Sequence, residues 1–258
     1  MSIAVALENR LSQCPRIATL GVKPNFSDYS PREQALIRKA ETLYYPSSFY
    51  APLFQAMGKK TFPGPAVYAC AQDKIAQTAL FQLMQIPHPR TKVYYGPQQK
   101  KFILRDFGLP LVAKIPRGSA QGKGVFLIQK PEQLAEYCKE NHAAYIQELL
   151  PIDRDIRVVV VGKQAVISYW RVPEQDAFLH NVAAGGEIVF DDVPREAVDL
   201  AVKTAICCGW DDVGLDLCMV DGRPLVMEAN MKYGRQGFAL AGIDYYSMME
   251  TFIADGKI

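Results

Sequence analysis

The chain has 258 residues, of which 49% are hydrophobic and 22% are charged, as is ordinary for a globular enzyme of one or two domains. Its 29 basic and 27 acidic residues leave a net charge of +2, which argues against a nucleic-acid-binding protein, since such proteins usually carry a strong basic excess. The six cysteines form no CxxC pair and no zinc-like spacing, so we expect reduced thiols and a cytoplasmic location. The first ten residues do not resemble a signal peptide, and no apolar run approaches the roughly 20 residues of a membrane-spanning helix.

The first third of the chain has the pattern of a small α/β unit. Residues 17–22 predict a short strand, and residues 31–43 predict a helix for which Ser30 is the N-cap. Residues 73–84 predict a second helix, which ends before a proline-rich break. With so few elements, this unit is expected to be incomplete.

The remainder alternates strands and helices, with frequent hairpins. The expected strands are 111–115, 125–129, 145–150, 156–161, 164–172, 213–220 and 225–230, and the expected helices are 132–140, 194–208 and 245–253. This mixture predicts an α+β or α/β fold with mostly antiparallel sheets.

The hairpin at 213–230 places three polar side chains in otherwise apolar strands. Glu228 and Asn230 are two residues apart and therefore share a face. Asp216 joins them only if the loop has three residues (221–223), because a two-residue loop (221–222) puts Asp216 and Glu228 on opposite faces. The three-residue loop is favoured because it places six apolar residues on one face of the hairpin: Leu215, Leu217, Met219, Leu225, Met227 and Ala229.

Two carboxylates and an amide oxygen at cross-strand spacing repel one another unless a cation lies between them. Oxygen ligands of this kind suit Mg²⁺, whose coordination is usually completed by water and nucleotide phosphates. The alternative is an ordinary exposed acidic face at a sheet edge. The hairpin by itself leaves both interpretations open.

A glycine-rich loop at 117–124 joins two apolar strands, and Lys114 ends the first of them. The loop fits neither the P-loop nor the GxGxxG spacing, and no helix follows it. A strand–loop–strand arrangement instead suggests a flap whose backbone N–H groups close over phosphates, with Lys114 as a point charge. The alternative is a flexible hairpin with solubilising charges.

Arg157 interrupts a valine-rich strand and Arg171 ends the strand that follows, so each needs a charged partner or a ligand. The alternative for both is a surface ion-pair network, which contributes little to stability. His180 has no nucleophile around it and is interpreted as an ordinary loop histidine. The sequence shows no Ser/His/Asp or Cys/His arrangement, so nucleophilic catalysis has no support.

The order of these motifs resembles the ATP-grasp superfamily and, within it, the RimK-like carboxylate–amine ligases. The resemblance covers about residues 73–258 and rests on Asp73-Lys74, Lys114, 117–124, 146–149, 155–157, Arg171, Asn181 with Gly185-Gly186, Asp216 and 227–230. It implies an α+β ATP-grasp fold in which two α+β subdomains sandwich ATP. The implied subdomains are a lid with the flap at 73–147 and a metal-binding, catalytic part at 148–258. A truncated, Rossmann-like N-terminal unit at 1–72 precedes them.

The resemblance also implies roles for single residues. ATP would be bound by Lys74, Lys114, Ser119, Gly122, Gly124, Gln147, Glu148, Leu149 and Asp155. The two lysines would hold the α- and β-phosphates, 147–149 would be the hinge against adenine, and Asp155 would reach the ribose. Mg²⁺, or Mn²⁺ in its place, would be bound by Asp216, Glu228 and Asn230, in agreement with the hairpin register. Arg171 and Asn181 would stabilise the transferring phosphoryl group, with Arg157 near them.

The implied reaction has two steps: a carboxylate attacks the γ-phosphate to form an acyl phosphate, and an amine then displaces the phosphate. The expected partners are ATP, a small carboxylate, and an amine or peptide, for which an amino acid such as glutamate is the example, with no nucleic acid and no membrane. The resemblance is also compatible with a homodimer. Two further hypotheses are an ATP-binding regulatory or assembly protein without ligase activity, and an ATP-grasp phosphotransferase or a ligase with a thiol acceptor.

Three departures from the family pattern concern substrate binding. The N-terminal unit is short, Ala183-Ala184 replaces the usual basic residue, and 231–235 replaces the usual small-residue-Pro-Gly turn. In the last segment, Lys232 and Arg235 are candidates for binding an anionic acceptor, the alternative being ordinary exposed charges.

Overall fold

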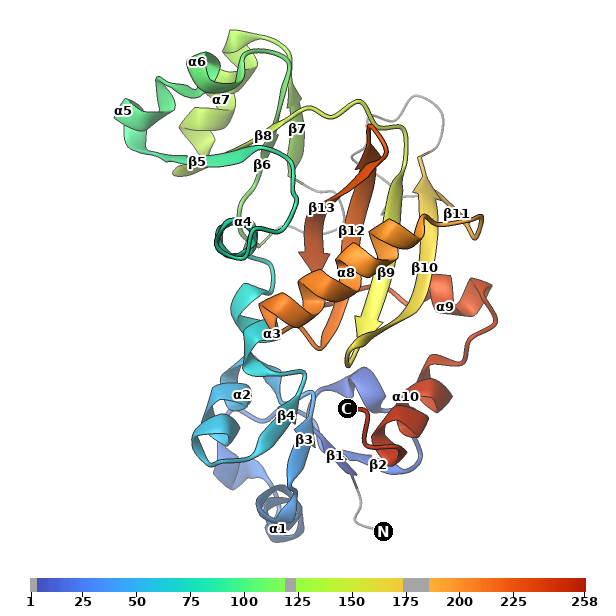
Figure 1. Ribbon diagram of the computed structural model, residues 1–258. Coiled ribbons are helices and arrows are strands. Elements are labelled where there is room, and N and C mark those ends of the chain that lie inside the picture. The colour runs from blue at the N-terminus through green and yellow to red at the C-terminus, as the bar shows by residue number, and fades with distance from the viewer. Residues whose placement is uncertain (1–3, 119–123, 174–185) are drawn as a thin grey trace.

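The computed structural model describes residues 4–118, 124–173 and 186–258, which form three sheets with helices packed around them. Figure 1 shows the three sheets one above another, with the N-terminal sheet at the bottom and the chain returning to it through its C-terminal helix. The mixture of helices, one parallel sheet and two antiparallel sheets confirms the predicted α+β class. Within the described residues, no helix is long and apolar enough to cross a membrane.

The N-terminal unit is a four-stranded parallel sheet of order β2-β1-β3-β4. Its helix α1 begins at Pro31 with Ser30 as the N-cap, as the sequence predicted, and Ser30 and Glu33 form a reciprocal capping box. The helix is shorter than the predicted 31–43, since the chain turns at Ala40 into β3. The elements are β1 (Ala4–Ala6), η1 (Asn9–Leu11), β2 (Ile17–Thr19), η2 (Phe26–Asp28), α1 (Pro31–Lys39), β3 (Thr42–Tyr44), α2 (Ser47–Ala56), β4 (Lys60–Phe62) and α3 (Pro65–Cys70).

The upper sheet, which we call the lid sheet, has the antiparallel order β5-β8-β6-β7. One face packs on its helices through a core that includes Leu111, Ile146, Ile103 and Leu134. Residues of the opposite face, such as Lys114, therefore point away from these helices. The elements are β5 (Thr91–Tyr95), α5 (Gly96–Lys100), α6 (Ile103–Phe107), β6 (Leu111–Lys114), β7 (Val125–Ile128), α7 (Pro131–Glu140) and β8 (Ala143–Glu148).

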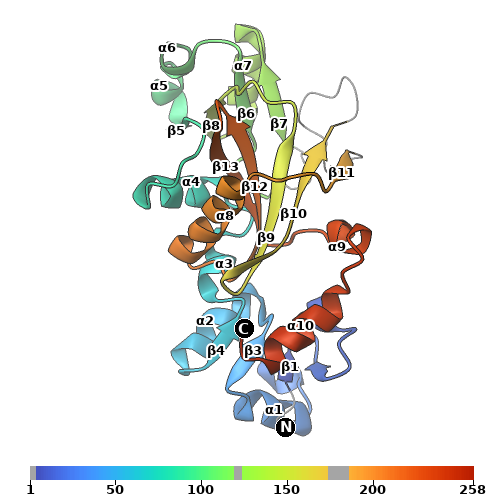
Figure 2. The same ribbon diagram turned by 45° about the vertical axis from the view of Figure 1, so that its right-hand side comes forward.

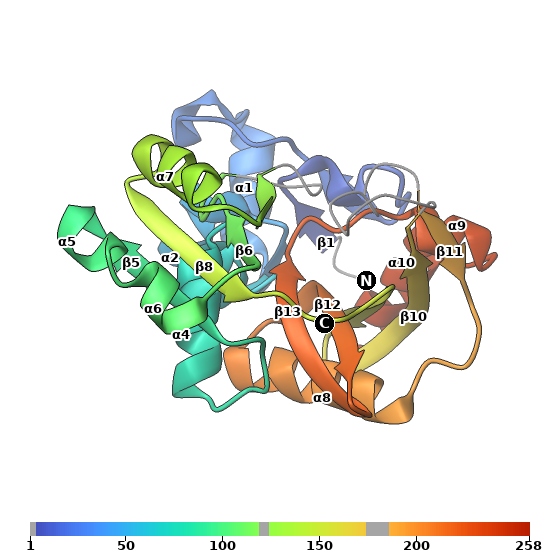
Figure 3. The same cartoon turned by 90° about the horizontal axis from the view of Figure 1, so that it is seen from above.

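The central sheet has the antiparallel order β11-β10-β9-β12-β13 and is covered on both faces. Strand β9 is rich in valine because both of its faces are buried. Val158 and Val160 pack towards α8, while Val159 and Val161 pack towards α9 and α10. Figure 3 shows α8 along one face of this sheet, and Figure 2 shows α10 beside the N-terminal sheet. The elements are β9 (Asp155–Val161), β10 (Gln164–Val172), β11 (Glu187–Val189), α8 (Arg195–Cys208), β12 (Asp212–Val220), β13 (Arg223–Asn230), α9 (Gln236–Leu240) and α10 (Tyr245–Ala254).

The predicted three-residue loop between β12 and β13 is wrong. Val220 pairs with Arg223, so the loop has the two residues Asp221 and Gly222, whose φ angles of 48° and 73° suit a tight hairpin turn. A β-bulge leaves Met227 unpaired and shifts the register by one residue, so that Asp216 nevertheless lies opposite Glu228. In consequence Val226, rather than the predicted Leu225 and Met227, is buried in the core with Leu215 and Leu217.

Helix α4 (Lys74–Leu83) connects the N-terminal unit to the lid sheet and lies against the edge strand β13. It begins at Lys74 because the side chain of Asp73 accepts a hydrogen bond from the backbone N–H of Ala76. Asp73 also pairs with Arg117 at 2.7 Å, at the start of the glycine-rich loop. The residue that caps α4 is thereby joined to the base of that loop.

Candidate functional site

The three predicted metal ligands lie together on one face of the β12–β13 hairpin. Asp216 and Glu228 are opposite one another in the register, and Asn230 donates a hydrogen bond of 2.8 Å from Nδ2 to Oδ2 of Asp216. Within the described part of the chain, no three His, Cys, Asp or Glu side chains form a metal-binding group. The predicted trio differs from such a group by using an amide as its third oxygen donor, a ligand type that hard cations accept.

Two arginines from neighbouring strands hold Asp216. Arg157 Nε lies 2.5 Å and Arg171 Nη2 lies 3.0 Å from Asp216 Oδ1. Arg171 also forms a bidentate ion pair with Asp155, with hydrogen bonds of 2.6 and 2.8 Å. Burial acts to raise the pKa of Asp216, but the charges of Arg157 and Arg171 outweigh it and hold that pKa below its usual value. Asp216 is therefore an ionised carboxylate, as an oxygen ligand for a cation must be.

Two buried lysines reach the same cluster from the lid side. Lys74 Nζ lies 3.1 Å from Glu228 Oε1, and Lys114 is 5% exposed on the lid-sheet face that points away from the lid helices. Burial lowers the pKa of Lys114, and the positive charge of Lys74 acts in the same direction, although Glu228 opposes it. A phosphate group would add the negative charge that favours the protonated form of Lys114.

The charges of this cluster suit a nucleotide with a divalent cation. Four cationic side chains (Lys74, Lys114, Arg157 and Arg171) meet three carboxylates (Asp155, Asp216 and Glu228), which leaves an excess of one positive charge among these seven groups. The carboxylates and Asn230 supply oxygen donors for Mg²⁺, and the cations supply donors for phosphate oxygens. The residues present therefore fit both a magnesium ion and the phosphates of a nucleotide.

The predicted adenine hinge lies where β8 ends. Gln147 is buried, and its Nε2 donates to Thr91 Oγ1 at 2.9 Å. Glu148 Oε1 accepts a hydrogen bond of 2.6 Å from the backbone N–H of Arg90, and Leu149 follows as a half-buried residue. These contacts tie the hinge to the neighbouring strand β5.

Of the predicted flap residues, Gly124 is described, whereas Ser119 and Gly122 lie outside the described residues, as does the catalytic candidate Asn181. Gly124 has a φ of +86°, and a Cβ added there would lie 2.8 Å from the side chain of Ile115. Its carbonyl accepts a hydrogen bond of 2.6 Å from the N–H of Ile115. A glycine is therefore required at this end of the loop, where the chain turns back against β6.

Comparison with known families supports what this geometry indicates. Residues 71–253 match the family described as the RimK-like ATP-grasp domain. The chain belongs to the RimK-like ATP-grasp family. This match covers the lid sheet, the central sheet and α10, and the fold is accordingly the ATP-grasp fold that the sequence predicted.

Several named proteins are similar to this RimK-like chain. A probable alpha-L-glutamate ligase of Legionella pneumophila (strain Paris) is 30% identical over 225 residues, or 84% of this chain and 72% of the relative. A ribosomal protein bS6--L-glutamate ligase of Salmonella paratyphi B is 28% identical over 239 residues, or 89% and 77%. Among solved structures, a RimK domain ATP-grasp protein of Sphaerobacter thermophilus has a TM-score of 0.71 at 18% identity, covering 96% of this chain and 98% of that one. D-alanine--D-alanine ligase of Bacillus anthracis has a TM-score of 0.68 at 14% identity, covering 98% and 96%.

Sequence reasoning did not single out two side chains of α4 that contact the site of this RimK-like protein. Gln77 hydrogen-bonds to the backbone of β13 between Glu228 and Asn230, and Thr78 lies 2.7 Å from the hydroxyl of Tyr145 on β8. The helical spacing puts Gln77 on the same side of α4 as Lys74, which is the one signal that could have drawn attention to it.

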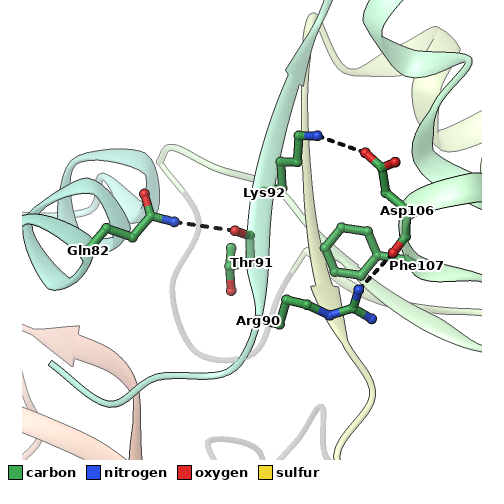
Figure 4. A pocket seen from close by; sticks show the side chains of 6 residues that line it. All are labelled: Gln82, Arg90, Thr91, Lys92, Asp106 and Phe107. Atoms are coloured by element: carbon green, nitrogen blue, oxygen red, sulfur yellow. Dashed lines mark hydrogen bonds and ion pairs between the residues drawn. The ribbon is translucent and has the colours of Figure 1, made fainter. Parts of the chain in front are cut away.

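A separate hollow of about 420 Å³ lies on the lid, beside strand β5, as Figure 4 shows. Its charged side chains have partners within the hollow: Lys92 Nζ lies 2.7 Å from Asp106 Oδ2, and Arg90 Nη1 donates to the backbone carbonyl of Asp106 at 2.7 Å. The lining residues are Gln82, Arg90, Thr91, Lys92, Asp106 and Phe107, and none of them is a predicted site residue. The hollow borders the hinge, because Thr91 and Arg90 bond to Gln147 and Glu148.

Proposed function

We propose that this protein is an ATP-dependent carboxylate–amine ligase whose reacting centre is the β12–β13 hairpin face. The observation that carries the proposal is the pairing of Asp216 with both Arg157 and Arg171, beside Glu228 and its partner Lys74. Oxygen donors and fixed cations thus occupy one place in a chain of the RimK-like family. Positioned cations are what phosphoryl transfer to a carboxylate requires, since they neutralise the charge on the moving group.

The ligands of the proposed site are ATP and Mg²⁺, with Mn²⁺ as a substitute. Asp216, Glu228 and Asn230 would bind the metal, which supplies charge neutralisation at the phosphates when bound. Lys74 and Lys114 would donate to phosphate oxygens. A structural neighbour, the ATP-grasp ligase PsnB, was solved with Mg and ADP, at a TM-score of 0.70 and 17% identity.

Arg171 and Arg157 are proposed to stabilise the transferring phosphoryl group and the acyl phosphate that follows. Arg171 donates two hydrogen bonds to the carboxylate of Asp155, and these bonds support a role for Asp155 in holding that guanidinium in place. Contact of Asp155 with the ribose, and a catalytic role for Asn181, stay predictions. The same holds for the division into an N-terminal unit at 1–72, a lid at 73–147 and a catalytic part at 148–258.

For the amine substrate we propose an α-amino acid, with glutamate as the first choice. The support comes from the names of the relatives, which are alpha-L-glutamate and ribosomal protein bS6--L-glutamate ligases. Lys232 and Arg235, the two cations predicted to bind the acceptor, are both exposed, and Arg235 also contacts Tyr246 and Tyr245 of α10. Their role in binding the acceptor stays a prediction. The homodimer stays a prediction, for which light scattering is the measurement.

Calorimetric titration with ATP, with and without Mg²⁺, tests the nucleotide site. We expect Mg²⁺-dependent binding in the wild type and binding weakened by at least about 10-fold in Glu228→Ala, because loss of even an indirect ligand partner has an effect of that size. Glu196→Ala, which removes an exposed carboxylate from α8, is the matched control and should bind as the wild type does. Equal binding by Glu228→Ala and the wild type would refute the assigned site.

Phosphate release separates the ligase from the two other hypotheses. A ligase releases phosphate from ATP only when a carboxylate and an amine are both present, whereas a regulatory ATP-binding protein binds ATP without amine-dependent release. A phosphotransferase transfers the γ-phosphate without an amine. Screening acids with glutamate as the amine is therefore the next measurement after binding.

A further inference from the structure

One side chain of α4 holds the outer edge of the strand that carries two proposed metal ligands. Gln77 is 2% exposed, and its amide meets both backbone groups of Ala229: Nε2 donates to the carbonyl at 2.8 Å, and Oε1 accepts from the N–H at 3.0 Å. Nε2 also donates to the carbonyl of Cys70 at 3.0 Å. The amide thus bonds to β13 as the peptide group of a neighbouring strand would.

The position of Ala229 makes this contact important for the metal ligands. In an antiparallel pair, successive residues direct their backbone groups alternately towards the partner strand and away from it. Ala229 faces outwards to Gln77, so Glu228 and Asn230 on either side of it face β12, which carries Asp216. The short segment that holds the two ligands is therefore fixed from both sides.

Helix α4 is itself a fixed support for Gln77. Its first residue, Lys74, pairs with Glu228, and Thr78 bonds to Tyr145 of the lid sheet. The bulge at Met227 lies immediately before the ligand segment, at a point where pairing with β12 is interrupted. Support from α4 is thus supplied where the hairpin's own pairing is weakest.

We propose that Gln77 is a positioning residue that sets the spacing of Glu228 and Asn230 for the metal. This inference rests on the proposed function, since it assumes that those two residues bind Mg²⁺. Without the amide, the N–H and C=O of Ala229 lose their partners, and the ligand segment is free to shift relative to Asp216. Such a shift weakens metal binding more than it weakens contacts of the nucleotide with the lid.

The test compares Gln77→Met, which keeps the length of the side chain and removes its hydrogen bonds, with the wild type. The matched control is Gln82→Met, on the same helix, whose amide bonds to Thr91 of the lid at 3.4 Å and does not reach β13. Binding of a non-hydrolysable ATP analogue is titrated by calorimetry over a series of Mg²⁺ concentrations. Thermal unfolding without ligand is measured for each variant.

We expect the Mg²⁺ concentration for half-maximal binding to rise by about 10-fold in Gln77→Met, as for other changes just outside a metal's ligand set, and to be unchanged in Gln82→Met. At saturating Mg²⁺ the analogue should bind Gln77→Met nearly as it binds the wild type. A lower unfolding temperature with an unchanged Mg²⁺ requirement would overturn the inference and leave Gln77 a purely structural residue. If Gln77→Met does not fold, Gln77→Glu, which keeps the acceptor and loses the donor, is judged by the same criterion. A wild type without Mg²⁺-dependent binding would overturn the proposed function, and this inference with it.

Discussion

The carboxylate of Asp211 lies at the junction of the N-terminal unit and the central sheet, where it accepts hydrogen bonds of 2.9 and 3.1 Å from the N–H of Gly64. Burial raises the pKa of Asp211 to about 6; the hydrogen bond from Gly64 opposes this shift and the neighbouring charge of Asp212 adds to it. An acid whose pKa is raised on folding favours the folded state only while it is protonated. The contribution of Asp211 to the unfolding free energy should therefore fall as the pH rises from about 4 to about 6 and stay low above that range.

The size of this loss follows from the shift of the pKa. From the ordinary value of 3.8 to about 6 is a difference of roughly 2.2 units, and at 1.36 kcal/mol per unit the loss is about 3 kcal/mol as an upper bound. Asp211→Asn is neutral at every pH and keeps an oxygen that accepts from Gly64. The stability of this variant relative to the wild type should therefore increase by up to about 3 kcal/mol as the pH rises from about 4 to about 7.5.

Urea denaturation of both proteins at several pH values across that range measures this gain. Asp199→Asn, which removes an exposed carboxylate from α8, is the control and should show a difference from the wild type that does not vary in this way. If the difference between Asp211→Asn and the wild type stays constant from about pH 4 to pH 7.5, the reasoning from burial is refuted.

Two further predictions concern packing and capping. A Cβ at Gly214 would lie 2.8 Å from Tyr233 Cβ and 3.2 Å from Arg157 Nη1, so Gly214→Ala should lower the unfolding free energy by about 1–3 kcal/mol in urea denaturation, and an unchanged midpoint would contradict this packing. Ser30→Ala removes the acceptor for the N–H of Glu33 and should destabilise the protein by about 1 kcal/mol in the same assay, whereas Ser30→Asp should retain the stability of the wild type.

The sequence was sufficient for elements whose signal is local. The apolar spacing of α8, the valine-rich β9 with its hairpin partner β10, and the capping residue Ser30 all identified their elements to within a few residues. The approach of Asp216 to Glu228 was also predicted, but from a three-residue loop that is wrong, and it is the bulge at Met227 that brings the two residues opposite one another. Chemical type and periodicity are properties of neighbouring residues, and one sequence displays them directly.

The features that the sequence did not predict correctly depend on residues far apart in the chain. The Asp221-Gly222 pair is itself a signal for a two-residue turn, but a regular apolar pattern overrode it, because the bulge at Met227 has no local signature. The hydrogen bonds between Gln77 and Ala229 join residues 152 positions apart. The parallel pairing of β1 with β3 likewise joins distant segments, each only three residues long. Short strands carry too few residues for alternation to be recognised.

The hydrogen bonds that occupy the outer edge of β13 also affect the tendency of the protein to self-associate. An exposed strand edge offers unpaired N–H and C=O groups to other chains and is a site at which aggregation begins. Here Gln77 occupies the groups of Ala229, and the carbonyl of Pro87 accepts from the N–H of Val226 at 2.9 Å. The opposite edge strand, β11, has only three residues. At the β13 edge the sheet thus offers fewer unpaired backbone groups to a second molecule, so the segment from α4 to Pro87 that supports the ligand strand also opposes extension of the sheet at this edge.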